Sequence, residues 1–107
     1  MTERTELKGH LDLLLLSVLA NGAAHGYGVI ERLRTRTDGV LDFPEGTVYP
    51  ALHKLEQQGL VASRWTKIAG RSRRMYALTR RGRTARQRRA GEWRTVTQAV
   101  DLVVGAS

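Results

Sequence analysis

Apolar residues recur at the spacing of a helix through the first third of the chain. We expect a first helix that Thr5 caps and Asn21-Gly22 ends. Its apolar stripe consists of Leu7, Leu11, Leu14, Leu15 and Val18. A second helix is expected to follow His25-Gly26 and to end at Asp38-Gly39, with an apolar stripe of Val29, Ile30 and Leu33.

A third helix is predicted to begin near Pro44, because proline fits the first turn, where its missing N–H is not needed. Its apolar stripe is Val48, Leu52 and Leu55, and Gln58-Gly59 ends it. Pro50 is tolerated only within the first two turns, so the pattern also allows a start that slips toward Thr47.

The pattern then changes from helical spacing to the alternation typical of strands. Residues 60–68 and 72–79 predict a β-hairpin around the turn at Ala69-Gly70. Thr79 is a suitable N-cap for a last helix over residues 80–104. Three helices, a hairpin and a long helix predict a mainly α protein with a small β-hairpin, the winged helix-turn-helix arrangement. We divide it into a winged domain, residues 1–79, and a C-terminal helix, residues 80–107.

Charge is unevenly distributed in this chain of 107 residues, whose net charge is +8. Residues 1–62 contain six Lys and Arg against eight Asp and Glu, whereas residues 63–107 contain twelve against two. A basic half of this kind favours a polyanionic partner. The apolar stretch from Leu11 to Ala20 is too short to span a bilayer, and no signal peptide is recognisable, so we expect a cytoplasmic protein with no membrane partner.

Three segments in the same order resemble the PadR family of transcriptional regulators. Residues 44–52 (PEGTVYPAL) and 55–61 (LEQQGLV) are similar to its recognition-helix region, residues 25–30 (HGYGVI) to the start of its second helix, and residues 73–82 (RRMYALTRRG) to its second wing strand. One departure is Glu45 between Pro44 and Gly46, where the family usually has Pro directly before Gly. The short tail resembles the compact subgroup with a single C-terminal helix. The resemblance implies a homodimer on operator DNA of dyad symmetry.

In such a fold the third helix enters the major groove with its N-terminal residues nearest the base edges. The candidate DNA-binding residues on this helix are Thr47, Tyr49, His53 and Lys54. Core packing is the alternative for Tyr49, and simple solvent exposure is the alternative for His53. Glu45 is expected to cap the helix rather than contact DNA.

The hairpin contains four cations around Gly70 without an intervening acid. These candidate wing contacts are Lys67, Arg71, Arg73 and Arg74. We expect them to reach phosphates or a minor groove, although charges at a hairpin edge also prevent strand aggregation.

The last helix has an apolar stripe with spacings of three, four and three. The stripe consists of Trp93, Val96, Val100 and Val103, and it is the candidate homodimer interface. Packing back onto the monomer is the alternative. In drug-responsive members of the PadR family that this chain resembles, a Trp on the last helix stacks planar aromatic compounds in a pore between subunits. Trp93 is therefore also a candidate ligand contact for a small aromatic effector.

Other classes of function find little support in the sequence. The chain has no cysteine, which excludes a thiolate zinc site, and its three histidines lack metal-ligand spacing. No catalytic motif is recognisable, so we expect no enzyme, no cofactor and no metal. The alternative is a basic winged-helix module that associates with RNA or with another protein. A regulator this short is expected to repress rather than activate.

Overall fold

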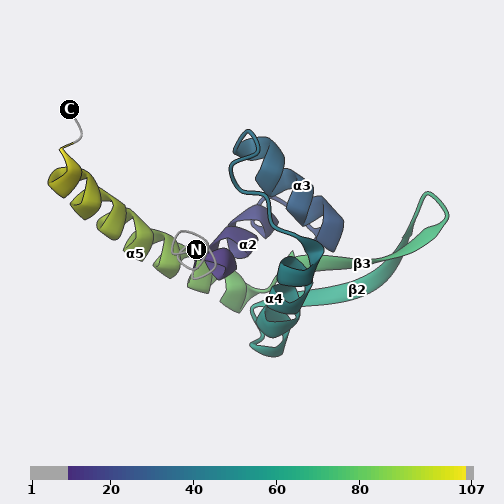
Figure 1. The fold of residues 1–107 in the computed structure, drawn as a ribbon. Helices are drawn as coiled ribbons and strands as arrows, with labels where there is room; N and C mark the ends of the chain where they lie inside the picture. Colours follow the sequence, from purple (N-terminus) through teal and green to yellow (C-terminus); the bar gives the residue numbers. More distant parts are fainter. Residues whose placement is uncertain (1–9, 106–107) are drawn as a thin grey trace.

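The structure of the protein is a computed structural model, which describes residues 10–105. Its helices and strands follow the order predicted from the sequence. The helices are α2 (Leu11–Leu19), α3 (Gly26–Arg36), α4 (Glu45–Gln57) and α5 (Arg80–Val104), and the strands are β1 (Ala24–His25), β2 (Val61–Ile68) and β3 (Arg71–Leu78). Figure 1 shows that α2, α3 and α4 form a body between two projections, the β2–β3 hairpin on one side and α5 on the other. This arrangement confirms the mainly α fold with a small hairpin.

The apolar stripes of the first three helices meet in one core. Leu15, Val29, Val48, Leu52 and Leu55 are each fully buried. Tyr76 of β3 joins them at 2% exposure and closes the core from the sheet side. The predicted Thr5 cap and Leu7 lie outside the described residues.

The sheet has a third strand that the sequence pattern did not indicate. β1 pairs antiparallel with β3, with Ala24 opposite Tyr76 and His25 opposite Met75. Two residues are too few to show an alternating pattern. This pairing fixes the start of α3 against the hairpin, and the His25 Nδ1 atom caps that helix by accepting a hydrogen bond from the Gly28 N–H at 3.1 Å.

Helix α4 begins at Glu45, with Pro44 in extended conformation as its N-cap. The predicted start near Pro44 is confirmed, and the alternative start at Thr47 is not seen. Pro50 is the sixth residue of the helix and thus lies within its first two turns. The helix continues through it, although proline lacks the N–H that would bond the Gly46 carbonyl.

Thr79 joins three elements at the base of the hairpin. Its hydroxyl accepts a hydrogen bond from the Gly82 N–H at 3.0 Å and donates one to the Gly59 carbonyl at 2.7 Å. The predicted N-cap of α5 is therefore present, and it also ties the end of α4 to the start of α5. From there α5 runs away from the body (Figure 1), which gives the protein its extents of 52 × 28 × 22 Å.

Candidate nucleic-acid interface

The outward face of α4 lies opposite the core stripe and consists of exposed residues. These are Gly46, Pro50, His53, Lys54 and Gln57. Two of the predicted contacts, His53 and Lys54, are on this face, and neither has a side-chain partner in the hydrogen bonds and ion pairs of the described residues. Sequence reasoning considered Pro50 only as a disturbance of the helix. Its exposure places an apolar ring at the centre of this outward face.

Thr47 and Tyr49 lie on opposite flanks of α4 rather than at its centre. Thr47 is half-buried and, with Lys54, lines a pocket of about 270 Å³ between α4 and the start of α2. Tyr49 packs over Gly26 at the start of α3, so close that a β carbon at Gly26 would lie 2.9 Å from the tyrosine hydroxyl. The packing alternative for Tyr49 thus describes its ring in this structure, with the side chain half-buried.

The strand register separates the four wing cations into two groups. Directly paired residues share a face, and Trp65 is opposite Arg74 while Ile68 is opposite Arg71. Arg71 and Arg73 therefore project from the face away from the core, together with Arg64. Lys67 and Arg74 share the other face with Trp65. Arg64 was missed by sequence reasoning, although strict alternation along the first strand would have placed it beside Arg71 and Arg73.

Arg74 points back toward α4 instead of toward the end of the hairpin. Its Nε donates to the Ser63 hydroxyl at 2.7 Å, and that hydroxyl donates to Glu56 Oε2, also at 2.7 Å. The Arg74 Nη2 atom lies 3.5 Å from Glu56 Oε1, and the guanidinium lies 5.9 Å from the centre of the Trp65 ring. The predicted cluster of four equivalent wing cations thus becomes three that lack an acidic partner among the described residues and one that is paired.

Tyr76 lies beneath this group and responds to it electrostatically. Burial raises the pKa of Tyr76 above its ordinary value of 10.0, the Arg74 guanidinium opposes this shift, and the Glu56 carboxylate and Tyr49 add to it. The base of the wing is therefore a place where the core, α4 and the hairpin meet through polar side chains.

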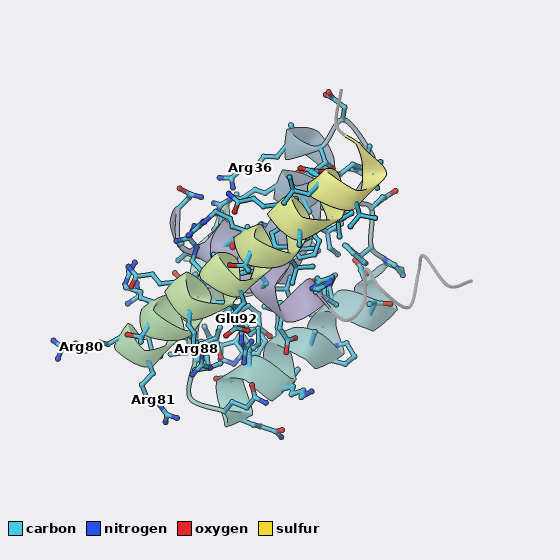
Figure 2. The ribbon with its side chains drawn as sticks, turned by 90° about the vertical axis from the view of Figure 1, so that its left-hand side faces the viewer. Arg36, Arg80, Arg81, Arg88 and Glu92 are labelled. Carbon is cyan, nitrogen blue, oxygen red and sulfur yellow. The ribbon has the colours of Figure 1, made fainter. Side chains whose placement is uncertain are left out.

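The start of α5 adds exposed positive charge beside the interface. Figure 2 shows Arg80 pointing away from the body into solvent, whereas Arg88 lies along the helix beside Glu92. The Arg81 side chain is exposed and turns back over Gly59 at the end of α4. The Arg88 to Glu92 ion pair is 3.8 Å long and both side chains are well exposed. These arginines form a solvated surface that contributes to long-range attraction of a polyanion.

The first half of α5 is attached to α2, and its second half is not. Arg86 donates to the Ser17 hydroxyl at 3.4 Å, and Arg89 lies 3.9 Å from Asp12. Beyond these contacts the predicted stripe is exposed, from 42% at Trp93 to 87% at Val103, with Val96 and Val100 near half. Only the start of the stripe approaches the rest of the monomer, and exposure rises to 87% at Val103.

Trp93 contacts the His10 ring edge-on, with the ring centroids 4.4 Å apart. The two side chains border an open pocket of about 340 Å³ between α2 and α5, which Asp12, Leu13, Arg89, Glu92 and Val96 also line. Residues 10–105 contain no cluster of His, Asp or Glu arranged to hold a metal ion. None of the helices described is long and apolar enough to cross a membrane.

Comparison with known proteins agrees with this geometry. The model of the transcriptional regulator PadR-like family matches residues 15–88. The chain is 38% identical over 73 residues to transcriptional regulator Rv3488 of Mycobacterium tuberculosis. The matched residues cover 68% of this chain and 65% of that protein. A transcriptional regulator from Clostridium thermocellum has a TM-score of 0.83 at 26% identity, over 91% of this chain and 92% of the other.

The fold is also that of a protein solved on DNA. Bacillus subtilis PadR in complex with operator DNA has a TM-score of 0.66 at 24% identity, over 72% of this chain and 44% of that one. The three-helix body, the hairpin and the basic surface define a winged-helix transcription factor. This chain belongs to the PadR-like family of transcriptional regulators and is a DNA-binding regulator rather than an enzyme.

Proposed function

We propose that this protein is a repressor that binds a pseudo-palindromic operator as a homodimer and is released by a small aromatic ligand. The observation that carries the DNA-binding part is the junction between α4 and the hairpin. The base of the hairpin is joined to α4 through Glu56, Ser63 and Arg74, and the unpaired cations lie farther along the same hairpin. A regulator that acts on chromosomal DNA in this way works in the cytoplasm.

On α4, the proposed base contacts are Thr47 and His53, and the proposed phosphate contact is Lys54. Threonine presents both a hydroxyl for a base edge and a methyl group for a thymine methyl. The Tyr49 hydroxyl contributes from the flank while its ring stays on Gly26. On the hairpin, Lys67, Arg71 and Arg73 reach phosphates or the minor groove, and Arg74 contributes from the base.

The proposed dimer uses the exposed stripe of α5. Trp93, Val96, Val100 and Val103 are spaced as a coiled-coil seam, and an exposed apolar stripe of this length on a projecting helix is stabilised by a partner. We therefore assign DNA binding to residues 1–79 and dimerisation to residues 80–107. A twofold dimer presents two α4 helices to successive turns of DNA, about 34–36 Å apart, which is why the operator is expected to have dyad symmetry.

The proposed effector site is the open pocket at Trp93. One face of the pocket is aromatic and apolar, with Trp93, His10 and Val96, and the other contains the Asp12 and Arg89 pair. A planar aromatic compound stacked on Trp93 would sit at the junction of α2, α5 and the dimer seam. Titration with planar aromatic dyes, followed by quenching of tryptophan fluorescence in the parent and in Trp93→Phe, tests this part. Equal quenching in both proteins contradicts it.

The DNA-binding part is tested by selecting genomic duplex fragments with the purified protein and measuring affinity for the recovered sequences. We expect inverted repeats. We also expect Thr47→Ala to reduce the preference for them over unrelated duplex by about tenfold, the effect of removing one base contact, with little change in non-specific affinity. Single-stranded and structured RNA serve as competitors. Preferential binding to RNA, or binding to no nucleic acid, would favour the alternative of an RNA-associated or protein-interaction module.

A further inference from the structure

We infer that Glu56, acting through Ser63 and Arg74, is a positioning residue that sets the angle of the wing relative to α4. This inference rests on the proposed function, because it concerns how α4 and the hairpin meet one duplex. In this role the acidic side chain of Glu56 on α4 favours the binding of a polyanion, although its own charge repels phosphate.

The contacts join three elements, α4 and the two strands of the hairpin, in a closed set. Ser63 is on β2, Arg74 is on β3, and both approach the same carboxylate on α4. The two oxygens of Glu56 are used separately, Oε2 by the Ser63 hydroxyl and Oε1 by the Arg74 guanidinium. Hydrogen bonds to charged groups are stronger and more directional than those between neutral groups. These contacts therefore fix both the orientation of the hairpin relative to α4 and its distance from α4.

The register explains why these residues meet. Ser63 is opposite Tyr76, and Arg74 is opposite Trp65, so all four side chains share the face of the hairpin that turns toward α4. Tyr76 is buried in the core at one end, whereas Trp65 is largely exposed at the other. These contacts therefore lie where the hairpin leaves the body, and Figure 1 shows the rest of the hairpin projecting from it.

This location amplifies small movements. Arg71 lies three residues beyond Arg74, which is about 10 Å along a strand. A swing of about 20° at Arg74 therefore displaces Arg71 by about 3 Å, enough to break a hydrogen bond to a phosphate. The exposed fractions are 38% for the Arg74 side chain and 27% for Glu56, so the pair is partly shielded from water and salt.

Whether a charge-removing substitution raises or lowers the affinity for DNA distinguishes this positioning role from simple charge repulsion. Glu56→Gln removes a negative charge near the proposed DNA surface, which by itself raises affinity for DNA. Loss of wing position lowers affinity and reduces the salt slope, because fewer phosphates are neutralised. Glu45→Gln is the matched control, since it makes the same change on the same helix at an exposed residue. The Glu45 side chain makes no hydrogen bond or ion pair among the described residues, so the helix cap expected of it is not seen.

The test measures operator affinity by fluorescence anisotropy between about 50 and 200 mM salt. We expect Glu56→Gln to bind about five- to tenfold more weakly, with a slope smaller by roughly one for each phosphate that the wing no longer reaches. Glu45→Gln is expected to bind as tightly as the parent or up to about threefold more tightly. Glu56→Gln that binds as well as Glu45→Gln overturns the inference. A parent protein without salt-dependent binding to duplex DNA overturns the proposed function instead.

A second measurement does not depend on DNA. In a Trp93→Phe background Trp65 is the single tryptophan, and it lies beside Arg74. Time-resolved fluorescence anisotropy is expected to show a larger amplitude of fast motion for Trp65 when Glu56→Gln is added, and no change with Glu45→Gln. Unchanged motion of Trp65 also contradicts the role of Glu56. Circular dichroism confirms that each variant is folded.

Discussion

The ring of Tyr49 lies over Gly26, so that a side chain of α4 is seated on the first residue of α3. A β carbon at Gly26 would overlap the ring, whereas one at Gly28 would make ordinary van der Waals contact at 3.5 Å or more. The glycine at the start of α3 therefore determines how closely α4 approaches that helix.

Gly26→Ala is expected to destabilise the protein by about 1–3 kcal/mol, the usual cost of overpacking, and to weaken operator binding by displacing α4. Urea denaturation and DNA titration measure the two effects, with Gly28→Ala as the control. Adding Tyr49→Ala should cost less in the Gly26→Ala protein than in the parent, because removing the ring relieves the clash that Gly26→Ala creates. Additive effects of the two substitutions would show that the ring does not rest on Gly26 in solution.

Gly82 and Gly91 of α5 make a matched pair for stability. A β carbon at Gly82 would clash with the Leu60 carbonyl and lie 3.2 Å from Leu78 Cδ2, whereas one at Gly91 meets nothing within 4 Å. We expect Gly82→Ala to lower the free energy of unfolding by about 1–3 kcal/mol. Gly91→Ala is expected to raise it by about 0.5–1 kcal/mol, because alanine favours a helix interior. Thermal and urea denaturation distinguish the two, and the same sign for both would contradict the close approach at Leu60.

The unpaired wing cations should determine the salt dependence of binding. Arg71→Ala combined with Arg73→Ala is expected to weaken binding to all duplex sequences and to reduce the salt slope by about two. The control is Arg34→Ala with Arg36→Ala, which removes the same charge from the end of α3 that lies away from the hairpin (Figure 1). If the control reduces the slope as much as the wing variant does, net charge rather than wing contact governs binding.

The exposed stripe of α5 should control the oligomeric state. Trp93→Asp and Val100→Asp each place a charge in the proposed seam, and we expect sedimentation analysis to show a monomer for both. Gln98→Asp is the control, because Gln98 lies on the opposite side of the helix and is exposed. A dimer that survives both seam substitutions would locate the interface on another surface.

Tyr76 should make the protein sensitive to alkaline pH. Its raised pKa means that the unfolded state loses the phenolic proton first as pH increases past about 10. The free energy of unfolding is then expected to fall by up to about 1.4 kcal/mol per pH unit until the folded pKa is reached. Below pH 10 both states are protonated and this group contributes no pH dependence.

Tyr76→Phe removes this titration while keeping the ring in the core. Urea denaturation from about pH 9 to about pH 11.5 should show a smaller loss of stability in the variant than in the parent. All other residues are the same in the two proteins, so the difference between the two curves reports Tyr76. Identical curves would mean that Tyr76 has an ordinary pKa in solution.

The helices and the hairpin were predictable because each signal is local. The stripe Val48, Leu52 and Leu55 repeats at the period of a helix, and Thr79 precedes a run of helix formers, so neither depends on distant residues. Strand β1 was not predictable, because two residues show no period and gain their structure only by pairing with β3. The apolar stripe on α5 was also predictable, because the spacing of its residues is visible in the sequence.

The sequence by itself determined which residues are apolar, which are charged and how each element is periodic, and thereby the winged-helix order. The tertiary structure decided which partner each polar side chain has. Arg74 looked equivalent to Arg71 and Arg73, yet it is paired with Glu56, eighteen residues away in sequence. Tyr49 looked available to DNA, yet its ring is packed on Gly26. Such contacts join separate elements, and their distances are set by how the whole core packs, which no local pattern contains.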